Sequence, residues 1–223
     1  MTQHSDDKIL AAIDLGSNSF HMIIARLRDG HFQVVDKLRE MVQLRAGLDE
    51  EGNLSEKSQE RAIACLARFG ERIDSLFANN VRIVGTNTLR VAHNSQTFLR
   101  KARQALNYPI EIIPNDENKF EKNEIEIIPG EEEARLIYLG VAHSLAFDKS
   151  RRLVMDIGGG STEFIIGEGF DGLKRESLEM GCVSFSQKFF SNGWLSAERM
   201  DIALMTAASR LRAIQRPYRN MVG

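Results

Sequence analysis

Two segments of the chain share one pattern and lie 142 residues apart, measured from Asp14 to Asp156. Each is an apolar run that ends in Asp-x-Gly, followed by a turn of small residues and a second apolar run. Apolar runs on both sides of a tight Gly/Ser turn predict a β-hairpin in a buried sheet. Because the pattern recurs at about one domain length, we expect two similar α/β halves.

The two turns are suited to holding a phosphate. Glycines let backbone N–H groups approach an anion closely, and serine hydroxyls add further donors. Asp14 and Asp156 would repel a bare phosphate, so we interpret them as ligands of a divalent cation, directly or through water. The spacing is neither that of the P-loop nor that of the dinucleotide fingerprint. The candidate phosphate ligands are Gly16, Ser17, Asn18 and Ser19 in the first turn and Gly158, Gly159, Gly160 and Ser161 in the second.

The composition is that of a soluble globular protein, because 43% of the 223 residues are hydrophobic and 27% are charged. A net charge of −2 gives no strong field that would attract nucleic acid. No apolar run approaches the ~20 residues of a membrane helix, and the polar N-terminus lacks a signal-peptide core. Cys65 and Cys182 are too few for a disulfide framework or a metal cluster. We therefore expect a reduced, cytoplasmic protein with no nucleic-acid partner and no stable membrane insertion.

Outside the hairpins, apolar spacings predict further strands and helices. Pro217 is expected to end the last helix, because proline has no backbone N–H to donate. The expected strands are 32–35, 81–85 and 174–180, and the expected helices begin near Ser55, Ser95, Gly130, Val183 and Ser196.

A short repeat interrupts this pattern. The sequence Ile-Glu-Ile-Ile-Pro occurs at 110–114 and again at 125–129, and the residues between the copies are highly charged. The copies could be two neighbouring strands, or one strand and a duplicated segment tolerated at the surface. We favour the duplication, which leaves open which copy belongs to the sheet.

Five ordered blocks resemble the N-terminal portion of the exopolyphosphatase / guanosine pentaphosphate phosphohydrolase (Ppx/GppA) family, and the resemblance to exopolyphosphatase is the nearer one. The blocks are AAIDLGSNSFHM at 11–22, GTNTLR at 85–90, GEEEARLIY at 130–138, DIGGGSTE at 156–163 and MGCV at 180–183.

The resemblance implies an α/β fold of the actin/Hsp70/sugar-kinase ATPase type, with two ribonuclease-H-like halves. Residues 1–135 would form the first half, with an insert near 115–129, and residues 136–223 the N-terminal part of a second, incomplete half. We therefore expect a truncated chain whose exposed sheet edge is prone to association. Such a chain could be inactive by itself.

The resemblance also assigns roles to individual residues. Glu133 matches the family's catalytic base, and its neighbours Glu131 and Glu132 are expected to raise its pKa. Arg90 matches an arginine that binds phosphate through its guanidinium group. Asp156 and Glu163 match acidic residues of the metal and catalytic centre, and Asp14 is the equivalent acid of the first half. The expected metal ligands are therefore Asp14, Asp156 and Glu163, and the expected cofactor is Mg²⁺ or another divalent cation.

These roles predict a metal-dependent hydrolase that releases orthophosphate from the end of inorganic polyphosphate. The alternative substrate is the 5′ γ-phosphate of pppGpp, attacked by the same mechanism. A further alternative is an ATP-handling or non-catalytic phosphate-binding module of the same fold. For the full-length protein we expect a homodimer in the cytoplasm, and peripheral association with a membrane stays open.

Overall fold

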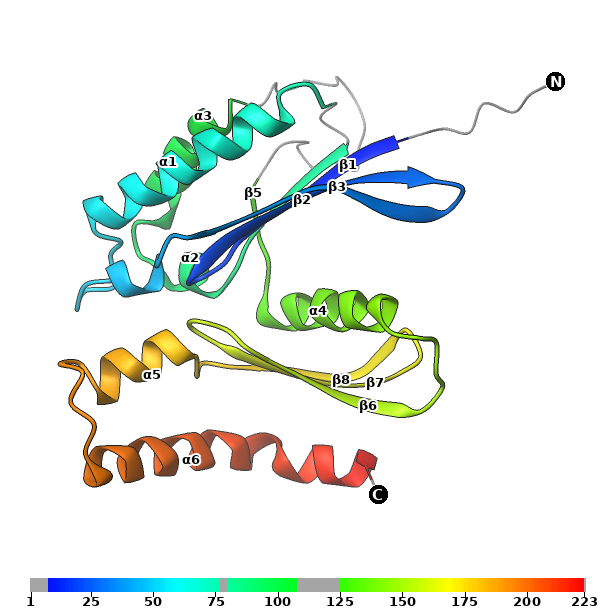
Figure 1. Cartoon of the computed structure of the whole chain (residues 1–223). Helices are drawn as coiled ribbons and strands as arrows, with labels where there is room; N and C mark the ends of the chain where they lie inside the picture. The colour runs from blue at the N-terminus through cyan, green and yellow to red at the C-terminus, as the bar shows by residue number, and fades with distance from the viewer. Residues whose placement is uncertain (1–7, 77–79, 108–124, 223) are drawn as a thin grey trace, which may run out of the picture. The chain divides into compact units, whose positions relative to one another are not determined.

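A computed structural model describes residues 8–76, 80–107 and 125–222 (Figure 1). The chain divides into two compact units, residues 1–127 and residues 128–223, called here the first and the second unit. Among the described residues, no helix is both long and apolar enough to cross a membrane.

The first unit is built on a five-stranded sheet with the order β3-β2-β1-β4-β5 (Figure 1). Strands β1 (Lys8–Leu15), β2 (Ser19–Arg28) and β3 (His31–Met41) form an antiparallel meander, in which the predicted hairpin turns at 16–18. Strand β4 (Val81–Gly85) pairs in parallel with the other edge of β1, and β5 (Ile125–Ile127) pairs in parallel with β4.

Helices α1 (Glu56–Ile73) and α3 (Ser95–Leu106) cover one face of this sheet. Alternate residues of β1 and β2, such as Ile13 and Met22, point into the core, where they meet Phe69 of α1 and Phe98 of α3. The short helices η1 (Arg45–Gly47) and α2 (Asn87–Val91) follow β3 and β4.

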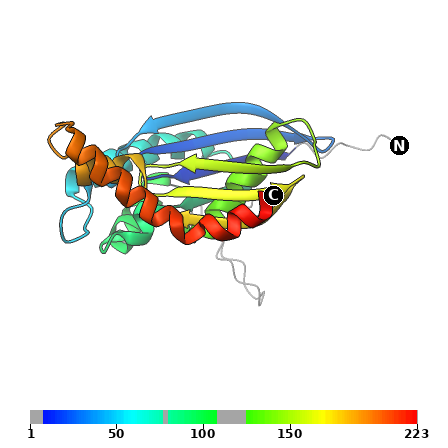
Figure 2. The same cartoon turned by 90° about the horizontal axis from the view of Figure 1, so that it is seen from below.

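The second unit is a three-stranded antiparallel sheet with one long helix on each face (Figure 1; Figure 2). Its strands are β6 (Arg151–Ile157), β7 (Thr162–Glu168) and β8 (Asp171–Leu178). Helix α4 (Gly130–Ser144) packs Ala134 and Tyr138 against Ile165 on one face. Helix α6 (Ala197–Val222) packs Ile214 and Tyr218 against Phe164 and Ile166 on the other, and α5 (Cys182–Phe189) precedes it.

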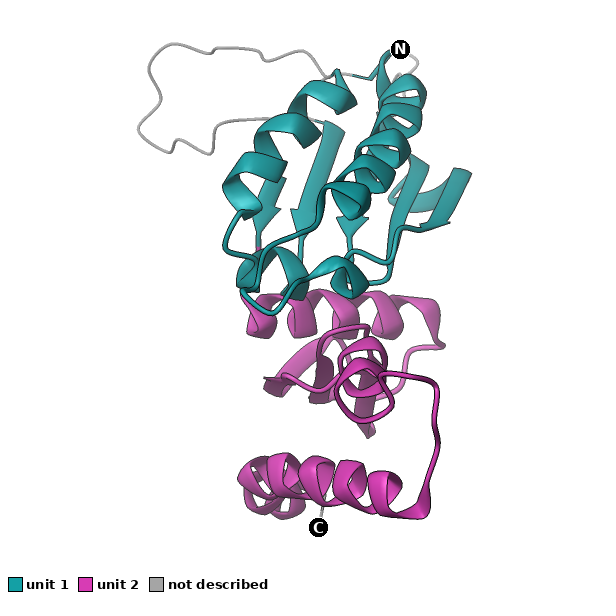
Figure 3. Ribbon diagram, turned by 90° about the vertical axis from the view of Figure 1, so that its left-hand side faces the viewer, with its two compact units in different colours: residues 1–127 teal, residues 128–223 magenta. Residues whose placement is uncertain are grey.

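The boundary between the units falls at 127/128, whereas the sequence placed it at 135/136 (Figure 3). The difference comes from the first turn of α4. Because α4 packs on β7 and β8 along its length, residues 128–135 belong to the second unit.

The end of α6 differs from the prediction, since Pro217 lies inside the helix and α6 continues to Val222. A proline in a helix interior removes one intrahelical hydrogen bond. Tertiary contacts hold the helix beyond this point: the Tyr218 hydroxyl donates to the Phe164 carbonyl at 2.6 Å, and the Tyr218 ring packs edge-on against Phe164.

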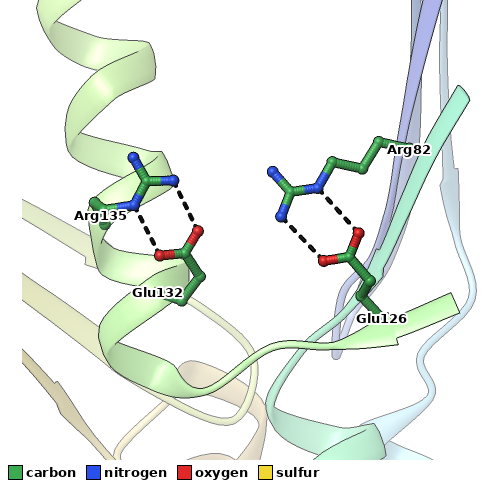
Figure 4. Close-up of polar contacts among 4 residues, drawn as sticks. All are labelled: Arg82, Glu126, Glu132 and Arg135. Atoms are coloured by element: carbon green, nitrogen blue, oxygen red, sulfur yellow. Dashed lines mark hydrogen bonds and ion pairs between the residues drawn. The ribbon is translucent and has the colours of Figure 1, made fainter. Parts of the chain in front are cut away.

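The second copy of Ile-Glu-Ile-Ile-Pro supplies strand β5, and the first copy lies outside the described residues. Ile125 is buried in the core of the first unit. Glu126 accepts two hydrogen bonds from Arg82 of β4, at 3.0 and 3.3 Å (Figure 4). The strand is therefore fixed by both a core residue and a cross-strand ion pair.

Candidate functional site

Three polar side chains form a row across the sheet of the second unit. In the strand register, Asp156 of β6 lies opposite Glu163 of β7, and Glu163 lies opposite Ser177 of β8. Directly opposed residues point to the same face of a sheet, and this is the face that α4 covers. The Ser177 hydroxyl donates a hydrogen bond to Oε1 of Glu163 at 2.8 Å.

Glu163 is the electrostatic centre of this row. Its side chain is 1% exposed, and its pKa is raised from the ordinary value of 4.5 to about 7, chiefly by burial. The carboxylate of Glu133, in the first turn of α4, is the second cause of this rise, and Asp156 contributes less. Hydrogen bonds from Ser161 and Ser177 oppose the rise. The second unit thus brings Glu133, Asp156 and Glu163 together.

The two acidic neighbours of Glu133 have different surroundings. Glu132 is bound by Arg135, whose Nε and Nη2 donate at 2.7 and 2.8 Å (Figure 4), and Glu131 is exposed. Glu163, thirty residues later in the chain, also interacts with Glu133 electrostatically. The effect of Glu131 and Glu132 on the pKa of Glu133 stays a prediction.

In the glycine turn of the second unit, residues 158–161, two carbonyl groups are held toward the start of α5 by hydrogen bonds. The Gly158 carbonyl accepts a hydrogen bond from the Cys182 N–H, and the Gly159 carbonyl accepts from the Val183 and Ser184 N–H groups, all at the start of α5. In a trans peptide the N–H points opposite to the C=O. The N–H groups of Gly159 and Gly160 therefore point away from α5, as a phosphate-binding turn requires.

The turn of the first unit is built in the same way. The Asn18 carbonyl accepts from the N–H groups of Val42 and Gln43, at 3.0 and 2.8 Å, and the Ser17 carbonyl accepts from the Arg45 N–H at 2.8 Å. The N–H groups of Asn18 and Ser19 consequently point away from this segment. The Ser19 hydroxyl is buried and has no hydrogen-bond partner within 8–76, 80–107 and 125–222, so it is available to a bound group.

Helix α2 carries Arg90 and is tied to this turn. The Ser17 hydroxyl accepts a hydrogen bond from the Thr88 hydroxyl at 2.7 Å and one from the Thr88 N–H at 3.3 Å. Arg45 donates to the Asn87 side chain at 3.4 Å. In the first unit, the turn and Arg45 thus both contact α2, the helix that carries Arg90.

Asp14 lies opposite His21 in the β1–β2 register, as Asp156 lies opposite Glu163 in β6–β7. Burial lowers the pKa of His21, and the nearby charges of Arg39 and Lys37 on β3 lower it further. The equivalent rows of the two units therefore differ in charge: one is acidic, and the other holds a histidine beside two cations.

The family model described as the Ppx/GppA phosphatase family matches residues 23–222. The chain belongs to the Ppx/GppA phosphatase family. A guanosine-5′-triphosphate,3′-diphosphate pyrophosphatase of Vibrio vulnificus is 45% identical over 221 residues, which cover 99% of this chain and 41% of that protein. A Haemophilus influenzae protein named provisionally as an exopolyphosphatase is 44% identical over 212 residues, 95% of this chain and 61% of that protein. The chain thus spans less than two thirds of these relatives.

Solved structures confirm the fold. An exopolyphosphatase-like protein superposes with a TM-score of 0.82 at 24% identity, covering 95% of this chain and 62% of that one. A Ppx/GppA enzyme of Aquifex aeolicus superposes with a TM-score of 0.69 at 28% identity, covering 93% of this chain and 64% of that one. The predicted α/β fold of the actin/Hsp70/sugar-kinase type is therefore the fold of this Ppx/GppA protein.

Sequence reasoning missed Ser177, Thr88 and Arg45. Ser177 lies on the strand after Glu163, and only the hairpin register shows that the two are opposed. Thr88 lies in the block that contains Arg90, but its contact with Ser17 spans 71 residues. Arg45 follows the meander in a segment without apolar periodicity. Long-range contacts of this kind leave no local signal in a single sequence.

Proposed function

We propose that this Ppx/GppA protein hydrolyses terminal phosphoanhydride bonds and releases orthophosphate from inorganic polyphosphate. The observation that carries the proposal is the buried Glu163 with a pKa near 7, set beside Glu133 and Asp156. Asp156 and Glu163 flank a turn whose N–H groups suit a phosphate, as in a site that combines an anion with a cation.

Each candidate residue has a distinct role in an in-line displacement of phosphate by water. Glu133 accepts the proton of the attacking water, which is the role of a positioned general base. In the second unit, the N–H groups of Gly159 and Gly160 bind phosphate oxygens. In the first unit, the N–H groups of its own turn and the planar guanidinium group of Arg90 are the phosphate ligands. Ser177 orients Glu163 through its hydrogen bond.

A divalent cation, Mg²⁺ by preference, fits Asp156 and Glu163. Among the described residues no group of three His, Cys, Asp or Glu side chains forms a ready metal cage. Mg²⁺ commonly uses one or two carboxylates and completes its shell with water and substrate phosphate. Burial is the largest cause of the raised pKa of Glu163, and the charges of Glu133 and Asp156 add a repulsion that a cation would relieve. When bound, the cation would neutralise charge that develops on the phosphoryl oxygens.

A second substrate, the 5′ γ-phosphate of pppGpp, is favoured by the relatives. The Vibrio vulnificus relative carries the name of a guanosine-5′-triphosphate,3′-diphosphate pyrophosphatase, whereas the Haemophilus influenzae relative carries that of an exopolyphosphatase. Because both bonds are phosphoanhydrides, the same carboxyls and turns serve either substrate. Phosphate release from long-chain polyphosphate and from pppGpp, at equal protein concentration, decides between them.

The roles are tested by replacing Glu133 with Gln, and by Glu131→Gln as the matched control. Glu131 lies two residues away in the same turn of α4 and is exposed. We expect Glu133→Gln to lower phosphate release by ~10²-fold or more, as loss of a general base does, and Glu131→Gln to leave it within about twofold. Equal activity of Glu133→Gln and wild type would sink the mechanism. No release by the wild-type chain from either substrate would contradict the function for this chain.

Cation binding has a readout that does not depend on activity. Mg²⁺ should raise the midpoint of thermal unfolding at pH 8, because a ligand that binds only the native state stabilises it. Asp156→Asn should reduce this rise, and Glu131→Gln should preserve it. An unchanged rise in Asp156→Asn would place the cation elsewhere.

A further inference from the structure

The phosphate turn of the first unit carries a hydroxyl at a position where the second turn has glycine. At the offset of 142 residues that relates the two hairpins, Ser17 corresponds to Gly159. The carbonyl of Ser17 accepts a hydrogen bond from the Arg45 N–H, and that of Gly159 accepts from the Val183 and Ser184 N–H groups. A glycine therefore suffices for the backbone of such a turn, and the turn geometry alone does not account for the Ser17 hydroxyl.

Thr88 of α2 makes two contacts with this hydroxyl. The Thr88 hydroxyl donates a hydrogen bond to Ser17 Oγ at 2.7 Å, and the Thr88 N–H donates to the same atom at 3.3 Å. Both side chains are buried, so water does not compete freely for these contacts. A serine hydroxyl has two lone pairs and one proton. Thr88 therefore occupies both acceptor positions of Ser17, and the Ser17 proton takes part in neither contact.

We propose that Thr88 is a positioning residue that keeps the Ser17 hydroxyl as a dedicated hydrogen-bond donor to a phosphate oxygen. This inference rests on the proposed function, in which the turn binds phosphate. With both lone pairs engaged, Ser17 can donate to an anion but cannot coordinate a cation. Accepting two hydrogen bonds also polarises the hydroxyl and makes its proton a better donor. Ser17 therefore favours a phosphate oxygen over Mg²⁺.

The same contacts link the turn to Arg90. Thr88 and Arg90 lie two residues apart on α2, a helix of only five residues. Because one of the two donors is the Thr88 N–H, the contacts fix the backbone of this helix as well as the Thr88 side chain. Thr88 therefore connects the turn and the arginine, which are the two sources of phosphate ligands that the first unit contributes to the proposed site.

Binding of tripolyphosphate by the 223-residue chain in metal-free buffer, measured by titration calorimetry, tests this role. Thr88→Val deletes the hydroxyl and keeps the backbone N–H, and we expect it to weaken binding by ~5-fold or more, because a hydrogen bond to a charged group is at stake. Thr88→Ser restores the donor and should bind within about twofold of wild type. Ser58→Ala, which deletes a fully buried hydroxyl of α1 that donates to the Ser55 carbonyl, is the matched control and should bind as wild type does.

A double-mutant cycle separates positioning from a purely structural role. If Thr88 acts through Ser17, Thr88→Val should weaken binding in the wild-type chain but not in the Ser17→Ala background. Neither substitution should change the rise in the unfolding midpoint that Mg²⁺ produces, because Ser17 does not coordinate the cation. Thr88→Ala deletes the same hydroxyl and replaces Thr88→Val if the circular dichroism spectrum shows that the latter does not fold.

Unchanged tripolyphosphate binding in Thr88→Val would overturn the proposal. So would additive effects in the double variant, a smaller Mg²⁺ effect in Ser17→Ala, or no binding by the wild-type chain. Hydrolysis is judged separately, by phosphate release in the presence of Mg²⁺. A wild-type chain that releases phosphate, with a Thr88→Val variant that binds normally, would refute the positioning role alone. A wild-type chain that binds without releasing phosphate, with a Thr88→Val variant that binds weakly, would contradict the hydrolysis and support the positioning role.

Discussion

Glu163 and His21 stand at equivalent positions in the two hairpins, opposite Asp156 and Asp14, and both resist taking a charge. Burial is the largest cause in each case: it raises the pKa of Glu163 and lowers that of His21. The neighbours then reinforce the effect, carboxylates around Glu163 and the cations Arg39 and Lys37 around His21. Each unit thus holds one strand-end aspartate beside a residue that is easily kept neutral.

The pKa of Glu163 predicts how stability depends on pH. An unfolded glutamate titrates near 4.5, whereas Glu163 in the folded state titrates near 7. Between these values the native state holds the extra proton, so the free energy of unfolding falls as the pH rises from 4.5 to about 7. The loss is on the order of 3 kcal/mol and is complete above pH 7. Urea unfolding in metal-free buffer across pH 4.5–8 measures it.

Glu163→Gln should remove this part of the pH dependence and be more stable than wild type at pH 8. Ser177→Ala, which deletes the donor to Glu163 Oε1, should instead shift the pH window upward, because the carboxylate loses a stabilising hydrogen bond. Glu131→Gln, an exposed acid, should titrate as wild type does. A Glu163→Gln variant with the wild-type slope would show that another group controls it.

At the scale of elements, two helical glycines should respond oppositely to alanine. Gly70 of α1 is buried, and a Cβ there would collide with the Leu106 carbonyl at the end of α3, lying 2.8 Å from its carbon. Gly140 of α4 is exposed and has nothing within 4 Å of that position. Gly70→Ala should cost about 1–3 kcal/mol, and Gly140→Ala should stabilise by about 0.5–1 kcal/mol. Urea midpoints measure both, and shifts of the same sign would contradict the packing argument.

The elements that local rules define were predictable. The turns at 16–18 and 158–161 break apolar runs, and β1, β2, β6 and β7 form the predicted antiparallel pairs. The strand Val81–Gly85 has the predicted bounds. The prediction that Pro217 ends the last helix was wrong. The hydrogen bond that the helix loses at Pro217 is offset by the contacts of Tyr218 with Phe164, which lies 54 residues earlier in the sequence. Propensity gives way where tertiary packing is stronger.

At the scale of the whole molecule, the repeat was visible in the sequence but the chemistry of each half was not. Asp14 and Asp156 could be matched by their identical setting, and the resemblance placed Glu133 and Glu163 near a catalytic centre. The charge of Glu133 helps to raise the pKa of Glu163, and Arg135 forms an ion pair with Glu132. Both effects depend on side-chain positions that are set by the packing of helix α4. The predicted metal set is still a prediction.

The two units should also differ in stability, because their cores differ in size. The first unit buries one large apolar cluster between its sheet, α1 and α3, which includes Phe20, Phe69 and Phe98. The second has two small clusters, one under α4 and one under α6, and exposes Leu153, Met155 and Ile157 at the edge of its sheet. Since burial of apolar area drives folding at about 25 cal/mol per Å², regions with fewer buried contacts open at lower free energy.

Hydrogen exchange followed by mass spectrometry measures this difference directly. At neutral pH we expect peptides of β7 and α4 to exchange at least tenfold faster than those of β1, β2 and α1. Phe69→Ala, which removes a fully buried ring, should cost about 3–5 kcal/mol and should accelerate exchange in the first unit more than in the second. Two results would contradict this prediction: equal protection from hydrogen exchange in both units, or an equal acceleration of exchange in both units by Phe69→Ala. Either would mean that the chain opens as one cooperative body, so that the size of a unit's core does not set that unit's stability.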